Sequence, residues 1–397
     1  MVIEHMIKLN TVDHETIRKS NRRKILSLLY QKRELTKQEI SKETGISIPT
    51  VTNNINELIA EGIIEEAGVA DSTGGRKPVI VRFIPDSRYS FGINIDLDHV
   101  RIILTNLDSQ IKYDTCFSIT GFDNIEEIFQ RIYKIVNQVI EENNIPKKNI
   151  SGIGFSLPGT VNEEKMLLEL APNLGVRNID FKIFTKLFSL PIYIENEANA
   201  AAFAELTLGI GQKLNNLIYI SVTQGIGTGI VIKDYLYKGK NKRAGEFGHT
   251  TIVAGGQKCS CGKNGCWELY ASDRALLKNY NKETQSNITS LKEFFTLLRD
   301  KNYTAQKVWE SYLDYLAIGI QNIILSLDPH YIIIGGEISQ LEDLLLEPLK
   351  ERVFIENSFY KEGDTKILTS RLKENSSILG ASLLPFQELF FVNEKII

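Results

Sequence analysis

The stretch that decides the fold is residues 245–268, GEFGHTTIVAGGQKCSCGKNGCWE. It sets one histidine, His249, shortly before three of the chain's four cysteines, Cys259, Cys261 and Cys266. Three thiolates and one imidazole form a closed tetrahedral set that is typical of structural zinc. Reduced, buried cysteines would not explain a Cys-x-Cys held among glycines, and the spacing differs from that of a zinc finger. We therefore predict a zinc cofactor that organises a loop within a larger domain, without an open position for Lewis-acid chemistry.

Acidic and amide side chains surround this metal set in the sequence. Glu246 and Glu268 lie within the quoted stretch, while Asn196 and Glu197 lie upstream, between a predicted strand and a predicted helix. A polyol ligand needs such groups because each of its hydroxyls can donate and accept a hydrogen bond. The alternative interpretation is that these acids are ordinary surface residues. If they converge on a cleft, the sequence predicts a sugar site there.

The motifs around these residues resemble those of the ROK family (repressors, open reading frames and kinases). The pattern Gly-Glu-x-Gly-His, followed by Cys-x-Cys-Gly-x-x-Gly-Cys-x-Glu, is similar to the family signature. Residues 156–159, 171–174 and 196–199 also resemble family motifs, and the resemblance covers about residues 88–390. It implies two actin/hexokinase-like α/β lobes around a sugar cleft, with the C-terminal helix returning to the first lobe.

The same resemblance implies a set of sugar contacts. The expected residues are Asn173, Asn196, Glu197, Glu246, His249 and Glu268, with Gly159 as a further candidate. His249 would serve twice, with one ring nitrogen on the metal and the other toward the sugar, which would couple metal binding to sugar affinity. Overall resemblance favours xylose as the sugar, although glucose or an amino sugar would fit the same polar set.

The start of the chain predicts a winged helix-turn-helix. Apolar residues at helical spacing predict a first helix over 16–30, and the capping box Thr36-Lys37-Gln38-Glu39 starts a second. A third helix starts at Ser47, and two strands at 63–66 and 78–83 then surround a glycine-rich tip. The alternative is a small helical domain that binds protein.

The third helix carries short polar side chains that suit base edges and phosphates. The predicted DNA contacts from this helix and the wing tip are Ser47, Thr50, Thr52, Asn53, Arg76 and Lys77. Asn54 is also expected to face outward, and Arg22, Arg23 and Lys24 are expected to hold phosphates from the first helix. The two wing cations sit beside a flexible glycine pair and suit a narrow minor groove.

Pro85-Asp86 marks a change in composition after the winged helix. Three strands in a meander, a helix over 124–143 and further alternating elements follow, which favours a two-lobed α/β protein with a cleft. The predicted domains are a DNA-binding domain at 1–85, a small lobe at 86–200 together with 375–397, and a large lobe with the zinc set at 201–374.

Composition fits a soluble protein of two or three domains, with 397 residues of which 43% are apolar and 24% charged. The first 85 residues are slightly basic and the remainder is acidic, which weakly suggests a nucleic-acid-binding front end. The first twenty residues lack the layout of a signal peptide, and the most apolar stretch, Leu316–Leu327, is too short to span a bilayer. We therefore expect a cytoplasmic protein without a membrane partner.

Three departures from the family's kinases predict that the chain is not an enzyme. Glu197 stands where those kinases have an aspartate general base, and its extra methylene shifts the carboxylate by about an ångström. Residues 96–100, Asp-Leu-Asp-His-Val, replace the phosphate loop Asp-x-Gly-Gly-Thr, so a polyphosphate would meet bulk and like charge. The downstream glycine loops, at 223–229 and 335–337, are only partly kept.

These features predict a sugar-responsive repressor that releases operator DNA when a sugar closes its lobes. Linkage requires sugar and DNA to weaken each other's binding by the same factor, typically ~5–150-fold. Helix-turn-helix geometry favours a homodimer, or a dimer of dimers, on an inverted repeat. Two alternatives stay open: a ROK sugar kinase that also binds DNA, and a repressor that a partner protein controls.

Overall fold

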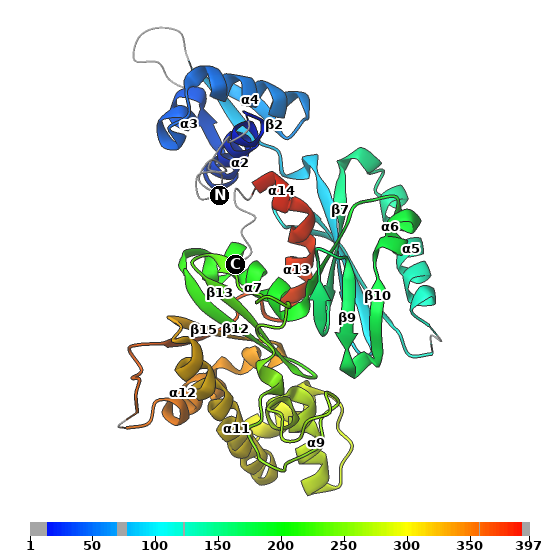
Figure 1. Cartoon of the computed structure of the whole chain (residues 1–397), viewed down its shortest axis with the longest axis vertical. Helices are drawn as coiled ribbons and strands as arrows, with labels where there is room; N and C mark the ends of the chain where they lie inside the picture. Colours follow the sequence, from blue (N-terminus) through cyan, green and yellow to red (C-terminus); the bar gives the residue numbers. More distant parts are fainter. Residues whose placement is uncertain (1–13, 70–77, 122–123, 357, 391–397) are drawn as a thin grey trace, which may run out of the picture.

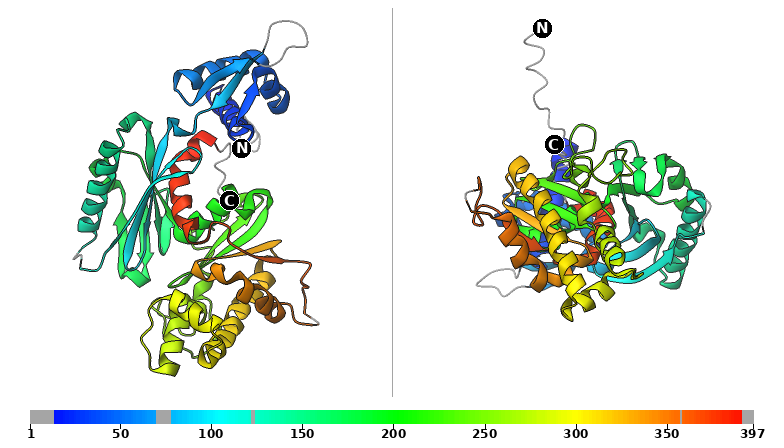
Figure 2. Two further views of the ribbon diagram at one scale, coloured as in Figure 1. Left: turned by 180° about the vertical axis from the view of Figure 1, so that it is seen from behind. Right: turned by 90° about the horizontal axis from the view of Figure 1, so that it is seen from below.

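The computed structural model describes residues 14–69, 78–121, 124–356 and 358–390, which form a small domain at one end of a two-lobed body (Figures 1 and 2). The small domain consists of α2 (His14–Lys32), β1 (Glu34–Thr36), α3 (Lys37–Thr44), α4 (Ile48–Ala60), β2 (Ile64–Val69) and β3 (Val79–Phe83). The predicted capping box is present at the start of α3. Thr36 Oγ1 accepts a hydrogen bond from the backbone N–H of Glu39 at 3.3 Å, and the Glu39 carboxylate accepts one from the backbone N–H of Thr36 at 2.7 Å.

Three strands form the sheet of this domain, in the order β1-β3-β2, where the sequence predicted two. The sequence analysis did not predict β1, because a strand of three residues is too short to show an alternating pattern. The three helices and the sheet share one apolar core, with Ile25, Leu29, Ile40, Val51 and Leu58 among its fully buried members. The arrangement is the predicted winged helix, with α4 as the second helix of the helix-turn-helix.

The first lobe is built on a five-stranded sheet in the order β11-β7-β4-β5-β6. Its strands are β4 (Tyr89–Ile95), β5 (His99–Asn106), β6 (Ile111–Ser118), β7 (Ile150–Leu157) and β11 (Ile192–Asn196). The first three form the predicted antiparallel meander, and β7 and β11 add to it in parallel. The helices α5 (Ile125–Glu142) and α6 (Lys182–Phe188) bury their phenylalanines against one face of this sheet.

A small sheet that the sequence analysis did not predict follows β7. β8 (Thr160–Asn162), β9 (Leu167–Ala171) and β10 (Val176–Asp180) pair antiparallel in the order β10-β9-β8. A single 3₁₀ turn between β9 and β10 carries Asn173. The hairpins of this sheet therefore present two turns, one with Asn173 and one with the acidic pair Glu163-Glu164.

The second lobe contains another five-stranded sheet, in the order β14-β13-β12-β15-β16. Its strands are β12 (Asn216–Val222), β13 (Ile226–Ile232), β14 (Tyr235–Leu236), β15 (Tyr331–Gly335) and β16 (Lys366–Thr369). The remaining helices are α7 (Glu197–Thr207), α8 (Glu268–Ala271), α9 (Asp273–Thr284), α10 (Leu291–Arg299), α11 (Tyr303–Leu327), α12 (Glu342–Val353), α13 (Ser376–Leu383) and α14 (Gln387–Phe390). Helices α8 to α12 bury one face of this sheet in a large apolar core.

Two helices, α7 and α13, lie side by side between the two five-stranded sheets (Figure 1). α13 packs on β4 and β7 of the first sheet, while α7 packs on β12 and β13 of the second. Glycines permit the close approach. A Cβ added at Gly154 of β7 would lie 1.9 Å from the carbonyl oxygen of Ala381, and one at Gly380 would lie 1.9 Å from that of Ala200. The pair therefore joins the sheets backbone to backbone.

The C-terminal end of the described chain docks the winged helix onto the body. Phe386, just before α14, is buried within the apolar core of the small domain. The rings of Phe390 and Tyr30 lie 5.2 Å apart, and Arg33 pairs with Asp108 of the first lobe at 2.6 Å. The polypeptide thus runs from α13 directly into contact with the small domain.

Two expectations concern the chain as a whole. Among the described residues, no helix combines the length and apolar character that crossing a membrane requires. The domain boundaries at 85, 200 and 374 stay a prediction.

We predict that Gly380→Ala destabilises the protein. Its methyl group would overlap the carbonyl group of Ala200, so α7 and α13 would have to separate, at a cost of about 1–3 kcal/mol in the free energy of unfolding. Gly363→Ala is the matched control, because an added Cβ there meets nothing within 4 Å. Thermal unfolding followed by circular dichroism is expected to show a lower melting temperature for Gly380→Ala alone. Equal melting temperatures for the two variants would contradict the close-packing argument.

Candidate functional site

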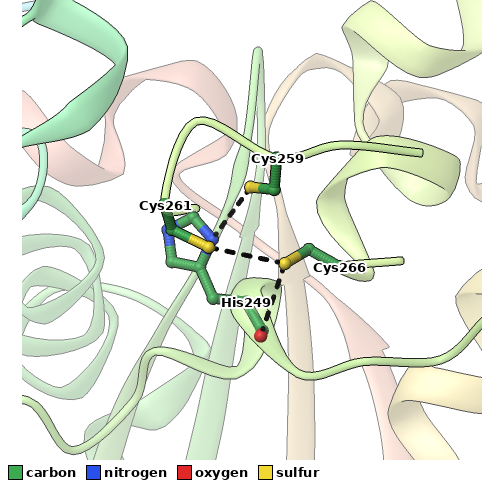
Figure 3. A group of neighbouring side chains, drawn as sticks. All are labelled: His249, Cys259, Cys261 and Cys266. Carbon is green, nitrogen blue, oxygen red and sulfur yellow. Dashed lines mark hydrogen bonds between the residues drawn. The ribbon is translucent and has the colours of Figure 1, made fainter. Parts of the chain in front are cut away.

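Four side chains, His249, Cys259, Cys261 and Cys266, converge on one point in the second lobe (Figure 3). Their candidate ligand atoms all lie within 4.8 Å of one another. Two isolated β-bridges hold the loop that carries the cysteines, and the two outer cysteines are buried. The predicted metal-ligating residues are therefore brought together.

The spacing of these atoms fits a tetrahedral metal ion. Cys261 Sγ and Cys266 Sγ are 3.6 Å apart, and Cys259 Sγ lies 3.6 Å from His249 Nδ1. Sulfur and nitrogen ligands about 2.3 Å and about 2.0 Å from a common tetrahedral centre stand about 3.5–3.8 Å from each other. Burial and the neighbouring thiols raise the pKa of Cys266 to about 12, so thiolates packed this closely need a cation. The four residues can therefore hold such an ion.

A cavity between the two lobes adjoins the metal-ligating cluster. It is lined by all six residues predicted to contact a sugar: Asn173, Asn196, Glu197, Glu246, His249 and Glu268. Gly159, the further candidate, also lines it. These residues come from separate segments of the chain, and the fold gathers them around one space. Their role in sugar binding stays a prediction.

Asn196 ends β11 and caps the N-terminus of α7. Its Oδ1 accepts hydrogen bonds from the backbone N–H groups of Ala198 at 2.9 Å and Asn199 at 3.2 Å. Its Nδ2 donates to the carbonyl oxygen of Gly159 at 2.8 Å. The side chain thus fixes the first turn of α7, and with it Glu197, against the cavity wall.

Glu197 and Asp96 place two partly buried carboxyl groups in the cavity wall. Glu197 Oε1 accepts a hydrogen bond from Ser221 Oγ at 2.8 Å, and Asp96 Oδ1 accepts one from the backbone N–H of Leu97 at 2.7 Å. Burial and then the charge of Asp96 raise the pKa of Glu197 to about 7, and burial likewise raises the pKa of Asp96. The pair therefore holds a proton near neutral pH and can donate as well as accept hydrogen bonds.

Glu246, His249 and Glu268 form the wall beside the metal-ligating cluster. His249 Nδ1 faces Cys259 Sγ and lies 3.5 Å from Glu268 Oε1, whereas His249 Nε2 lies 4.0 Å from Glu246 Oε2. Burial raises the pKa of Glu246, and the charge of His249 opposes this rise. The imidazole thus presents one nitrogen to the cysteines and the other to an acid of the cavity wall, and its double role stays a prediction.

Ser260 is a cavity neighbour that the sequence analysis missed. It lies between two cysteines of the metal-ligating cluster, and its Oγ donates a hydrogen bond to Asn173 Oδ1 at 2.8 Å. Asn173 belongs to the first lobe, so this bond crosses from one lobe to the other. A serine between two cysteines gives no signal in the sequence, because its partner lies far away in the chain.

Asp96 and Leu97 also line the cavity, as do residues 223–227. The sequence analysis treated these segments as remnants of phosphate loops and did not count them as ligand contacts. A Cβ added at Gly225 would lie 2.9 Å from Glu268 Oε2, so this loop approaches the acid closely. The sequence motifs identified both segments, but only the fold shows that they line the same cavity as the predicted sugar contacts.

The predicted DNA contacts of the helix-turn-helix lie at the start of α4. Ser47 and Asn53 are exposed, and Thr50 and Thr52 are half-buried. Ser47 Oγ and Thr50 Oγ1 are 2.9 Å apart. Arg76 and Lys77, the predicted wing contacts, lie outside the described residues. All six stay predictions.

One expectation about this surface was wrong. Asn54, predicted to face outward, is only 4% exposed, and its Nδ2 donates to the carbonyl oxygen of Thr50 at 2.8 Å. Its position three residues after the buried Val51 places it on the core side of the helix. Arg22 hydrogen-bonds the Glu61 carboxylate at 2.7 Å, so a phosphate would have to compete for this guanidinium.

Comparisons with known proteins agree with this architecture. The sequence model of the ROK family matches residues 90–388, and that of winged helix-turn-helix DNA-binding domains matches residues 18–65. The xylose repressor of Bacillus spizizenii is 32% identical over 376 residues, which span 94% of this chain and 97% of that protein. The glucokinase of Thermotoga maritima is 28% identical over 274 residues, 65% of this chain and 84% of that protein.

A solved structure resembles nearly the whole chain. It is a ROK family transcriptional regulator, described as a homolog of the E. coli MLC protein, with a TM-score of 0.81 and 25% sequence identity. The match covers 94% of this chain and 97% of that one. The winged helix and the two-lobed body thus occur together in a known regulator, whereas the glucokinase leaves about a third of this chain unmatched.

We predict that Glu197 makes the stability of the protein depend on pH. Its pKa of about 7 in the folded protein lies above the model-peptide value of about 4.3, so the folded state binds more protons between these values. The resulting stabilisation is fully present below the lower value and is lost as the pH rises through the upper one. Glu197→Gln, which cannot titrate, should therefore gain on the order of 2 kcal/mol in unfolding free energy relative to wild type from pH 5 to pH 8.

Urea unfolding of both proteins at several pH values in this range checks this. Glu351→Gln, at an exposed carboxylate of α12, serves as the control and should follow the wild type. A difference between Glu197→Gln and wild type that stays constant with pH would show that Glu197 is ionised throughout.

Proposed function

The chain belongs to the ROK family, and on this basis we propose that it is a sugar-responsive transcriptional repressor. It binds operator DNA through its winged helix and releases the DNA when a sugar occupies the cavity between its lobes. The observation that carries the proposal is the presence, in one chain, of a helix-turn-helix with a polar recognition face and of a cavity whose wall includes all six predicted sugar contacts. The relatives named xylose repressors support xylose as the sugar.

Operator recognition is assigned to α4 and the wing. Ser47, Thr50, Thr52 and Asn53 would meet base edges and phosphates in the major groove, while Arg76 and Lys77 would enter the minor groove. A homodimer, or a dimer of dimers, would set two such helices on an inverted repeat. The protein would act in the cytoplasm, where its operator is accessible.

Sugar recognition is assigned to Asn173, Asn196, Glu197, Glu246, His249 and Glu268. Carboxylates accept hydrogen bonds from sugar hydroxyls, and a protonated carboxyl or an amide N–H donates to them. The raised pKa values of Glu197, Asp96 and Glu246 support a wall that supplies both kinds of group near neutral pH. A neutral polyol is the ligand that such a wall suits.

We further propose that the bound sugar is not phosphorylated. Glu197 stands at the position of the kinases' aspartate base, and Ser221 already donates to one of its oxygens. A carboxyl group with a pKa of about 7 is also partly protonated at neutral pH, which removes a fraction of the base. Asp98 and His99, whose side chains lie 2.6 Å apart, stand at the two glycines of the phosphate loop, where a kinase would keep bare backbone for a polyphosphate.

Zinc is the ion that we assign to His249, Cys259, Cys261 and Cys266. When bound, the ion would cross-link the turn at His249 to the cysteine loop, and the closed ligand set would leave it no catalytic position. Glu268 adjoins these ligands and lines the cavity, and Ser260 bonds to Asn173 of the cavity wall, so loss of the ion would disturb the wall as well as the loop.

The proposed function predicts a sugar response without sugar phosphorylation. In a thermal-shift screen of pentoses and hexoses on zinc-replete protein, we expect xylose to raise the melting temperature, because a ligand that binds only the folded state stabilises it. The same sugar should release the protein from a DNA fragment that has been selected for binding to this protein. ATP-dependent phosphorylation of any aldose at ordinary rates would instead identify a kinase that binds DNA. If no sugar raises the melting temperature or releases the DNA, the result would indicate control by a partner protein.

The zinc assignment predicts a selective effect of cysteine substitution. We expect Cys261→Ser to lose most of the bound zinc, to unfold at a lower temperature and to bind sugar more weakly, because the loop beside Glu268 would no longer be held. Cys116→Ser is the matched control, since Cys116 is an exposed cysteine of β6. Elemental analysis and thermal unfolding measure both effects. Equal zinc contents in the two variants would refute the assignment.

A further inference from the structure

The loop that follows β14 reaches across to the first lobe and buries Lys238 between the lobes. Lys238 is only 5% exposed, and its Nζ donates hydrogen bonds to Glu163 Oε1 at 2.9 Å and to Glu195 Oε2. Glu163 lies in the turn between β8 and β9, and Glu195 lies in β11, so both carboxylates belong to the first lobe. One buried ammonium group therefore bridges the two lobes.

Lys242 extends this ion network toward the surface. Its Nζ lies 3.0 Å from Glu163 Oε1 and 2.8 Å from Glu164 Oε1. Burial by itself lowers the pKa of Lys238, but the charges of Glu195 and Glu163 raise it above its ordinary value. Because separating the lobes would leave these buried charges without partners, the network favours their contact.

The second oxygen of Glu195 organises the ligand wall. Glu195 Oε1 accepts hydrogen bonds from the backbone N–H of Asn196 at 2.8 Å and from Nδ2 of Asn199 at 3.2 Å. Asn196 caps α7 and lines the cavity together with Glu197. The carboxylate that holds Lys238 thus also holds the start of α7.

The backbone of Lys238 is tied to the opposite wall. Its carbonyl oxygen accepts a hydrogen bond from the backbone N–H of Ala244 at 3.1 Å, which closes the loop on itself just before Glu246. Thr228 Oγ1 bonds the next carbonyl, that of Gly245, at 2.5 Å. The loop that carries Lys238 therefore delivers Glu246 to the cavity.

We propose that Lys238 is a positioning residue for the sugar cavity. It holds the two lobes together and fixes Asn196 and Glu246 on opposite walls, although it does not line the cavity itself. The nature of the ligand rests on the function proposed above, whereas the closure of the lobes does not. Lys242 supports the same closure from the rim.

The first test measures closure without sugar or DNA. Small-angle X-ray scattering should give a larger radius of gyration for Lys238→Met than for the wild type, because methionine keeps the stem but removes the charge. Lys240→Met is the matched control, since Lys240 lies on the same loop and is exposed. A radius equal to that of the wild type in both variants would overturn the proposal.

The second test separates positioning from stability. Isothermal titration of D-xylose should show ~10–100-fold weaker binding to Lys238→Met, by analogy with the loss found when a residue that orients the ligands of a metal ion is removed. Operator affinity in the absence of sugar should be no weaker than that of the wild type, because in the proposed switch it is closure of the lobes that releases DNA. A globally damaged protein would lose operator binding. Unchanged xylose affinity would overturn the positioning role.

A second variant guards against misfolding. Lys238→Met leaves Glu195 buried without its cation, so the double variant Lys238→Met/Glu195→Gln removes both charges and should fold with the same expanded radius. A compact double variant with wild-type xylose affinity would contradict the proposal. If the wild type binds no sugar, the proposed function is wrong. The comparison of the radii of gyration still decides whether Lys238 holds the lobes together.

Discussion

The close packing of α7 against α13 is the constraint on which the rest of the molecule depends. The carbonyl of Ala200 meets the Cα of Gly380 with no room for a side chain, and a Cβ added at Gly229 of β13 would lie 2.5 Å from the carbonyl oxygen of Ala198. With Gly154 on the other side, backbone meets backbone from the first sheet through both helices to the second. Interiors packed this closely do not deform gradually, so a helix that moves must carry its neighbour with it.

This pair of helices also connects the cavity to the DNA-binding domain. α7 begins at Glu197 in the cavity, and buried Glu205 near its far end accepts hydrogen bonds from the backbone N–H groups of Ile210 and Leu372. α13 follows that second segment and leads to Phe386 in the core of the winged helix. A ligand that displaces the first turn of α7 therefore acts on a continuous packed path to α4, which gives the proposed switch a physical route.

Local patterns in the sequence predicted what local chemistry determines. The capping box at Thr36, the meander and the metal-ligating residues each depend on residues close in the chain, and the structure has all three. The sheet of β8 to β10, the pairing of Lys238 with Glu195 and the burial of Asn54 depend on contacts over long separations or on the rotation of a helix. Periodicity and composition carry little of that information. In a helix, a position that faces the solvent can be the immediate neighbour in sequence of one that faces the core.

The protonation of its carboxyl groups determines which ligand the cavity suits. A kinase must hold an anionic polyphosphate beside the hydroxyl that attacks it, and its site neutralises the developing negative charge. Here Asp98 and His99 replace the two glycines of the kinases' phosphate loop, and burial, together with repulsion from Asp96, raises the pKa of Glu197 in the cavity wall to about 7. A polyphosphate would raise the repulsion further, whereas a neutral polyol can take a hydrogen bond from the protonated acid and donate one to the ionised one. The loss of the loop glycines and the partly protonated Glu197 therefore make the cavity a poor place for phosphate transfer, whereas the same pair of acids suits an unmodified sugar.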